Sequence, residues 1–195
     1  MVDGRWWGVC YDLGMAMLES SARHSFLFPA GVAEAMGYFG ALGRVLGYMP
    51  HIELGDEQPT AADGYRLVYR TREMGVYDVL VVCDVRLVVD EAAGLLKLEP
   101  AVWPDLPVVE AAVMPDRTVA TGDFSLEGVF RPEGKQTAVA LSVSIVSELP
   151  TGEVPRFVPL NRIFKLVGRV AQKRLEESLV VFGREAVVGW GKGRA

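Results

Sequence analysis

The sequence closes with a long amphipathic helix that follows a series of alternating strands, and this order restricts the folds open to the chain. Over residues 159–182, apolar residues recur at three- and four-residue spacing, and basic residues lie largely off this stripe. At 1.5 Å per residue such a helix would be about 35 Å long, which is enough to cross a whole sheet. We therefore predict a sheet packed against one terminal helix.

Most of the chain before this helix shows the two-residue alternation of strands with one buried face. The segments with this pattern are residues 18–28, 65–71, 79–87, 95–98, 122–130 and 139–145, with brief strands also expected at 51–54 and within 108–113. Two short helical patterns, after Pro29 and over residues 42–46, follow the first strand. The predicted class is α+β, with a curved antiparallel sheet of six or seven strands wrapped around the C-terminal helix.

The two ends of the chain differ in composition from the part between them. A chain of 195 residues fits one domain, which we assign to residues 18–188. Residues 1–17 contain Trp6, Trp7 and three glycines without clear periodicity, so they form either an extension or an ordered arm covering part of the domain. Residues 189–195 are rich in glycine but lack the strand-to-helix context of a phosphate loop, and we predict a flexible tail.

Composition argues against several classes of protein. The net charge of −5 gives no support for nucleic-acid binding. No apolar stretch reaches the roughly 18 residues of a membrane span, and the N-terminus lacks the layout of a secretory signal. Cys10 and Cys83 form neither a disulfide framework nor a metal-ligand pattern, so we expect a cytoplasmic protein in which Cys83 is a buried apolar residue.

Positive charge is concentrated at the C-terminal end. Residues 156–195 contain nine Lys or Arg and three Asp or Glu, although the chain as a whole is acidic. A solvated outer face of the terminal helix accounts for this asymmetry. The alternative is a weak contact with an anionic membrane surface or an acidic protein partner.

The order of elements resembles the helix-grip superfamily, which includes START lipid-transfer domains, birch-pollen-allergen-like proteins and polyketide cyclases. One part of the resemblance is the strand ending at Phe28-Pro29-Ala30, the two short helices, and Tyr48-Met49-Pro50-His51-Ile52 leading into the next strand. The other part is the strand over 137–148, a proline-bearing linker and the final helix.

The resemblance covers residues 18–182 and implies a seven-stranded antiparallel sheet around the last helix. It supports the fold better than any activity, because the superfamily includes binding proteins, transfer proteins and enzymes. The proline-rich stretch 99–117 departs from a simple meander, which leaves the strand count and the shape of a cavity mouth open there.

A strongly bent sheet and one helix do not always fill the space between them, and the resemblance favours an apolar cavity there. The alternative is that the same bulky residues pack a solid core. The expected guest is an apolar small molecule, such as a lipid, an isoprenoid or a polyketide-like compound. The residues predicted to line the cavity are Phe26, Leu67, Tyr69, Val81, Val85, Phe124, Leu126, Leu141, Phe164 and Val167.

The sequence contains no recognisable catalytic or metal-binding pattern. His24 and His51 do not lie at metal-ligand spacing with a cysteine or a second histidine, so we expect no metal and no cofactor. Binding or transfer of a ligand is the first hypothesis. The alternatives are a cyclase- or dehydratase-type enzyme using Tyr69 or His24 for proton transfer, and an interaction module using Trp6, Trp7 and the basic helix face.

Overall fold

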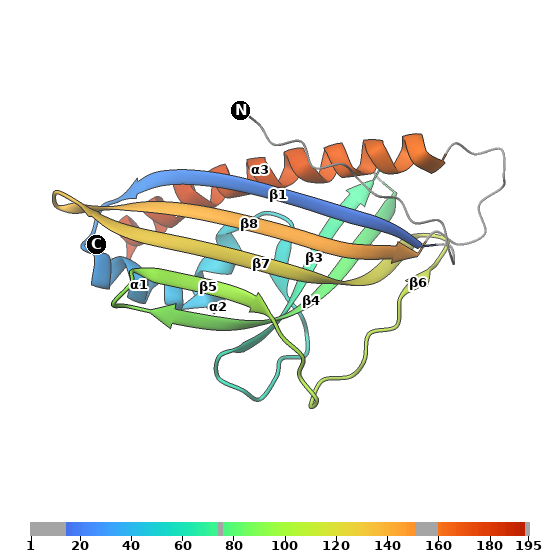
Figure 1. Cartoon of the computed structure of the whole chain (residues 1–195), viewed down its shortest axis with the longest axis horizontal. Coiled ribbons are helices and arrows are strands. Elements are labelled where there is room, and N and C mark those ends of the chain that lie inside the picture. Colours follow the sequence, from blue (N-terminus) through green and yellow to red (C-terminus); the bar gives the residue numbers. More distant parts are fainter. Residues whose placement is uncertain (1–14, 74–75, 151–159, 194–195) are drawn as a thin grey trace.

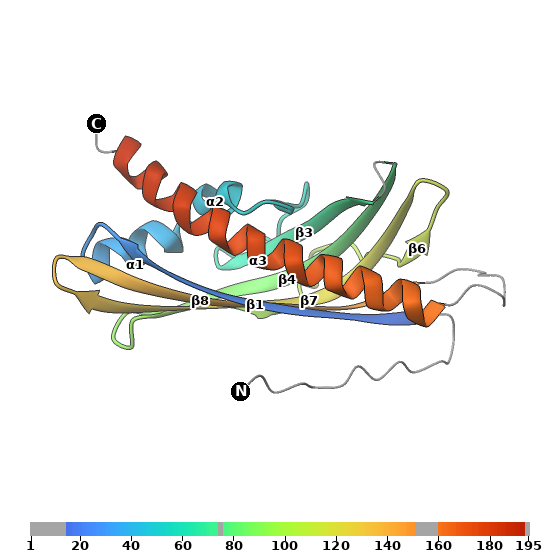
Figure 2. The ribbon, with the colours of Figure 1, turned by 90° about the horizontal axis from the view of Figure 1, so that it is seen from above.

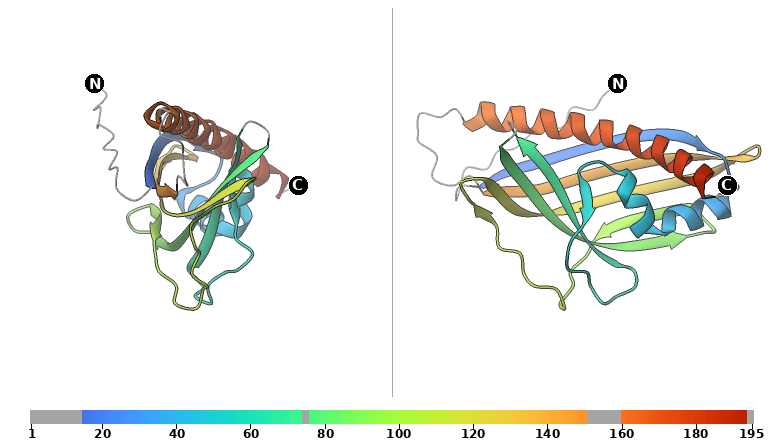
Figure 3. Two further views of the ribbon diagram at one scale, coloured as in Figure 1. Left: turned by 90° about the vertical axis from the view of Figure 1, so that its right-hand side faces the viewer. Right: turned by 180° about the vertical axis from the view of Figure 1, so that it is seen from behind.

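The alternating strands of the sequence form one curled sheet, which holds the terminal helix α3 (Leu160–Lys192) against its inner side (Figure 1). The computed structural model describes residues 15–73, 76–150 and 160–193, and describes side chains in residues 17–72, 76–150 and 168–193. Figure 2 shows α3 running diagonally over the sheet, and Figure 3 shows the sheet curling beneath it as a half-barrel.

Within the described residues, eight strands make up the sheet, and three short helical segments accompany α3. The strands are β1 (Met15–Phe28), β2 (Ile52–Leu54), β3 (Gly64–Glu73), β4 (Tyr77–Asp90), β5 (Leu95–Pro100), β6 (Ala112–Val113), β7 (Arg117–Glu133) and β8 (Gln136–Pro150). The short helical segments are α1 (Val32–Gly40), α2 (Leu42–Val45) and the 3₁₀ helix η1 (Leu46–Tyr48). Seven strands follow in the order β1-β8-β7-β5-β4-β3-β2, and β6 pairs with β7. The predicted α+β class and its seven-stranded antiparallel path are confirmed.

The strand β8 shows why alternation was a good guide to the sheet. Val139, Leu141, Val143 and Ile145 are buried, whereas the residues between them are more exposed. The strand pairs with all of β1 on one side and with residues 122–133 of β7 on the other. These three strands form the floor on which α3 lies.

The strand β7 changes partners at Gly122. Residues 117–121 pair in parallel with residues 78–82 of β4, and from Gly122 onwards the strand pairs with β8. A Cβ atom at Gly122 would lie 2.6 Å from the carbonyl oxygen of Val146 and 2.8 Å from the Val81 side chain. Glycine therefore permits the close approach by which β7 reaches β4 beyond the end of β5.

The terminal helix is longer than the sequence pattern predicted, because it continues past Phe182 to Lys192. A flexible tail over 189–195 is wrong for residues 189–192. The ring of Trp190 packs with those of Phe28 and Tyr38, with centroids 5.2 Å from each. Gly189 lies against the hydroxyl groups of Tyr38 and Tyr48, so glycine here serves close packing rather than flexibility.

Two other predicted boundaries also differ from the structure. The strand β1 begins at Met15, so residues 15–17 belong to the sheet and not to an extension. The remainder of that predicted extension, including Trp6 and Trp7, lies outside the described residues. The strand expected within 108–113 is limited to Ala112 and Val113, since the preceding loop leaves the sheet after Pro100.

Candidate functional site

The larger described cavity lies between α1, α2, η1, strands β5, β7 and β8, and α3. The twelve described residues that line it are all apolar or glycine, and they include Leu46, Met49, Leu126, Leu141 and Phe182. We call it the apolar cavity. Its volume is about 20 Å³, which is room for one water molecule. Small-molecule pockets are usually roughly 300 Å³ or larger, so the core in this conformation is nearly filled.

The smaller described cavity lies between β1, β3, β8 and α3 and has a volume of about 10 Å³. We call it the Ser20 cavity. The residues that line it are Leu18, Ser20, Tyr69, Ile145, Ala171 and Leu175. Unlike the apolar cavity, it has two hydroxyl-bearing side chains in its wall.

The structure places the ten residues predicted to line a cavity in different surroundings. Leu126 and Leu141 line the apolar cavity, and Tyr69 lines the Ser20 cavity. Phe26 is partly buried and packs against Phe39 of α1 at a centroid distance of 6.1 Å.

Four others fill the core without lining either described cavity. These are Leu67, Val81, Val85 and Phe124, each 1% exposed or less. Phe164 and Val167 belong to the first turns of α3, whose side chains lie outside the described residues. Strand parity thus identified the inward face, but it did not distinguish residues that line a space from residues that fill one.

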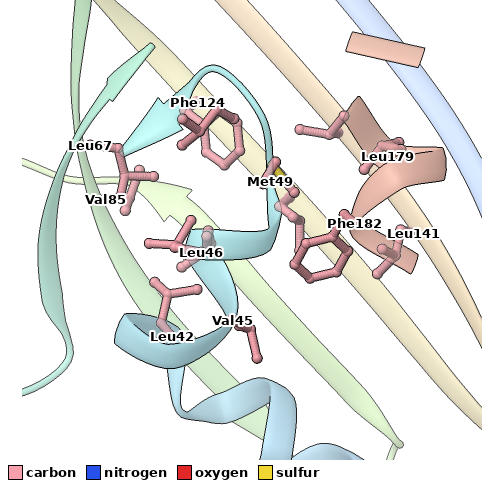
Figure 4. Packing of buried hydrophobic residues seen from close by; sticks show 14 of the residues in the cluster. Leu42, Val45, Leu46, Met49, Leu67, Val85, Phe124, Leu141, Leu179 and Phe182 are labelled. Carbon is pink, nitrogen blue, oxygen red and sulfur yellow. The ribbon is translucent and has the colours of Figure 1, made fainter. Parts of the chain in front are cut away.

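The residues of the short helical segments were missed by the sequence reasoning. Leu42, Val45, Leu46 and Met49 are buried and line the apolar cavity from the side opposite the sheet. Figure 4 shows them gathered over the sheet strands near Phe182. Their spacing along the chain was a usable signal, because it places apolar side chains on one face of a helical segment.

The candidate proton-transfer residues do not form a catalytic pair in the described part of the chain. His24 stacks on Phe26 at 5.9 Å and lines neither cavity. His51 is exposed, and its ring centroid lies 6.4 Å from that of Tyr69. Tyr69 is the one ionisable residue among those lining the two described cavities.

Two buried groups have altered acidity but no partner suited to catalysis. Burial, reinforced by the charges of Asp123 and Asp84, raises the pKa of the Cys83 thiol to about 12, so this buried thiol is a poor nucleophile. Burial, together with a hydrogen bond to Tyr48, also raises the pKa of Tyr38 to about 12. Within the described residues, no three His, Cys, Asp or Glu side chains gather as a metal site would require.

Hydroxyl groups contact the C-terminal half of α3, or the chain beside it, where the helix passes the two short helices. The Tyr38 hydroxyl lies 3.3 Å from the carbonyl oxygen of Ala186 and 3.4 Å from the Tyr48 hydroxyl. The Ser178 hydroxyl donates to the carbonyl oxygen of Pro50 at 3.2 Å. These contacts hold α3 beside the apolar cavity, where Phe182 forms part of the wall.

No protein-family model matches the sequence, and no curated protein matches it in sequence. The structure is similar to the Zhui aromatase/cyclase of Streptomyces sp. R1128, at 12% identity over 90% of this chain and 95% of that one, with a TM-score of 0.51. It is also similar to TTHA0849 of Thermus thermophilus, at 18% identity over 87% and 98% of the two chains, with a TM-score of 0.49. A further similar structure is the lipid transfer and protein localization domain of human StarD13, at 9% identity over 94% and 90%, with a TM-score of 0.43.

These similarities concern the fold, and the chain has the helix-grip fold that the order of its elements predicted. Among the helices in the described part of the chain, none is both long enough and apolar enough to span a bilayer.

Proposed function

We propose that this chain binds or transfers an apolar small molecule, such as a lipid, an isoprenoid or a polyketide-like compound, at the apolar cavity. The observation that carries the proposal is the composition of the wall, in which every one of the twelve residues is apolar or glycine. Such a wall offers no hydrogen bond to a polar guest and favours one that removes apolar surface from water.

The proposal requires the cavity to enlarge, and the attachment of residues 41–49 makes this feasible. Within the described chain, the backbone hydrogen bonds of this segment are local, such as those from Arg44 and Val45 to Ala41 and from Met49 to Leu46. The segment contacts the sheet through apolar side chains. An outward shift would therefore break no ladder hydrogen bond in the described chain. It would move the Tyr48 hydroxyl away from Tyr38, and a guest would replace the apolar contacts that are lost.

Unusual backbone conformations occur at Ala41, where this segment begins, and at His51, two residues beyond its end, where the carbonyl oxygen accepts a hydrogen bond from the Arg70 N–H of β3. Ala41 adopts φ −78° and ψ 67°, which is neither helical nor extended. His51 has a φ of 67°, in the left-handed region that non-glycine residues seldom adopt. Met49, with its flexible thioether chain, adapts readily to an altered cavity shape.

The enzyme alternative lacks a comparable observation. In the described part of the chain, Tyr69 lines the Ser20 cavity without a second ionisable residue in its wall, so proton donation and proton removal have no pair of groups there to perform them. The interaction-module alternative rests on Trp6 and Trp7, which lie outside the described residues, and on a helix face where Lys173 already pairs with Glu177 at 3.7 Å.

Binding of the neutral fluorescent probe N-phenyl-1-naphthylamine to the purified full chain tests the proposal. Organic extracts of the same preparation are examined by mass spectrometry for a co-purified apolar compound. The wild-type chain is expected to bind the probe, and Leu46→Trp, which fills the cavity, is expected to weaken binding at least tenfold. Val102→Trp is the control, because Val102 is 90% exposed on a loop.

A second variant covers the case in which the larger side chain disturbs folding. Leu141→Ala enlarges the cavity and is expected to bind the probe more tightly than the wild type. The proposal fails if neither the wild type nor Leu141→Ala binds the probe and no apolar compound co-purifies. It also fails if a folded Leu46→Trp chain binds as the wild type does.

A further inference from the structure

We propose that the Ser20 cavity is a polar subsite, which receives one neutral hydrogen-bonding group, a hydroxyl or a carbonyl, of the otherwise apolar ligand. This inference rests on the proposed function and narrows its ligand class to molecules with a long apolar body and a single uncharged polar group. Ser20 supplies the hydrogen bond, and the body extends towards the apolar cavity.

The primary observation is the state of the Ser20 hydroxyl. Ser20 is 5% exposed, and its Oγ is buried without a hydrogen-bond partner in the described structure. Buried hydroxyl groups are normally paired, because losing water without a replacement partner is unfavourable. The residue lines a cavity, so a guest that enters there meets a group able to donate or accept one hydrogen bond.

The other residues around this cavity argue for one polar contact rather than several. Leu18, Ile145, Ala171 and Leu175 are apolar, and Tyr69 is the remaining residue with a hydroxyl. The arrangement suits a small polar group attached to an apolar body. A strongly polar guest, such as a sugar, would lose most of its hydrogen bonds to water without replacement.

The charge of the wall argues for a neutral group. Among the described residues, the six that line the Ser20 cavity include no Lys, Arg or His. A carboxylate or phosphate placed there would be buried without a countercharge in the wall, which is strongly unfavourable. Arg66 is a buried cation, but it does not line this cavity and already donates two hydrogen bonds to Asp84.

The two cavities lie in line along the same elements. On α3, Leu175 lines the Ser20 cavity and Phe182 lines the apolar cavity, seven residues or about 10 Å further along the helix. On β8, Ile145 and Leu141 make the same division on one face of the strand. An elongated guest would thus contact both cavities, once the buried side chains between them shift.

The test uses three probes of similar shape with the purified full chain: 2-naphthol, 2-methylnaphthalene and 2-naphthoate. Dissociation constants are measured for the wild type, Ser20→Ala and Ser25→Ala, an exposed serine of the same strand that serves as the control. We expect Ser20→Ala to weaken 2-naphthol about fivefold relative to 2-methylnaphthalene, which corresponds to one hydrogen bond. Ser25→Ala should leave that ratio unchanged, and 2-naphthoate should bind the wild type more weakly than 2-naphthol.

The outcomes separate this inference from the proposed function. If both neutral probes bind and Ser20→Ala leaves the ratio of their dissociation constants unchanged, Ser20 does not form the proposed polar subsite. The proposed binding of an apolar ligand is then still supported. If 2-naphthoate binds more tightly than 2-naphthol, the inference that the subsite receives a neutral group is wrong. If no probe binds to the wild type or to Leu141→Ala, the proposed function fails and the inference fails with it.

A ligand-free measurement gives an independent check. Because the hydroxyl is unpaired without a guest, Ser20→Ala should raise the unfolding temperature of the ligand-free chain or leave it unchanged. A clear fall in that temperature would mean that the hydroxyl has a structural partner, and it would overturn the subsite.

Discussion

The side chain of Gln172 on α3 pairs with both backbone groups of Ser21 on β1. The Ser21 N–H donates to the Gln172 side-chain oxygen at 3.0 Å, and the Gln172 amide nitrogen donates to the Ser21 carbonyl oxygen. One amide thus occupies the place that a neighbouring strand would take at the edge of the sheet. It also fixes the position of α3 along β1, and therefore the positions of Ala171 and Leu175 over the Ser20 cavity.

We predict that Gln172→Ala lowers the free energy of unfolding by about 1–2 kcal/mol, because two hydrogen bonds with the Ser21 backbone and one with the exposed Glu176 are lost from a partly accessible site. Lys173→Ala is the matched control, since its side chain is 77% exposed and pairs with Glu177 on the same helix. That control should change the free energy by no more than about 0.5 kcal/mol. Urea unfolding followed by circular dichroism measures both, and equal losses would contradict the pairing.

Two Arg–Asp pairs bridge β3 and β4 in similar geometry but in different surroundings. Arg66 donates to both oxygens of Asp84 at 2.7 and 2.8 Å, and Arg72 donates to both oxygens of Asp78 at 2.7 and 3.0 Å. The side chain of Arg66 is 9% exposed and that of Arg72 is 66% exposed. Arg66 also donates to the carbonyl oxygen of Pro107, so the buried pair holds the loop that follows β5.

We predict that Asp84→Ala costs about 3 kcal/mol of unfolding free energy, because it removes the hydrogen-bonded countercharge of the buried Arg66 guanidinium and leaves only the exposed Glu57, 4.0 Å away. Asp78→Ala should have a far smaller effect, since water screens the Arg72 charge. Changing both partners to apolar residues, as in Arg66→Met with Asp84→Leu, should recover most of the loss. Similar losses for Asp84→Ala and Asp78→Ala in chemical denaturation would refute the difference in burial.

The strands could be predicted from the sequence because their alternation reflects one buried face. Residues 139–145 illustrate this directly, since Val139, Leu141, Val143 and Ile145 are buried and each residue between them is more exposed. The end of α3 could not be predicted in the same way. Glycines at 183, 189 and 191 weaken the helical signal, and the packing of Gly183 against Phe26 and of Trp190 against Phe28 outweighs local propensity.

The candidate site was less predictable than the fold for a geometric reason. Parity assigns Phe124 and Leu126 to the same inward face of β7, yet only Leu126 lines a described cavity. The volume of a cavity is the small difference between the space enclosed by the backbone elements and the space filled by their side chains. A pattern of apolar residues in the sequence does not show this difference. The unpaired hydroxyl of Ser20 was equally hidden, because parity places it inward but does not show which partners surround it.

We predict that Gly189→Ala destabilises the chain by about 1–3 kcal/mol, although alanine favours helices more than glycine does. A Cβ atom there would overlap with the Tyr48 hydroxyl and lie 2.9 Å from the Tyr38 hydroxyl oxygen. Gly191→Ala is the control, because no atom lies within 4 Å of its added Cβ, and it should be neutral or slightly stabilising. Thermal unfolding of Gly189→Ala with Tyr48→Phe should show partial recovery, and equal behaviour of the two alanine variants would disprove the close contact.

The stability of the folded chain should depend on pH in the alkaline range because of Tyr38. Burial, followed by its hydrogen bond with Tyr48, raises the pKa of Tyr38 from 10.0 to about 12. The folded chain therefore holds this proton more tightly than the unfolded chain. The stabilisation of the folded chain by this proton is fully present below pH 10 and is lost as the pH rises towards 12. Tyr38→Phe has no such proton, so the unfolding free energy of the wild type should fall more steeply between pH 9.5 and 11.5 than that of the variant. Parallel pH profiles for the two chains would contradict the raised pKa. A difference in unfolding free energy that shrinks at high pH would assign the effect to Tyr38, which lies where α1 meets α3.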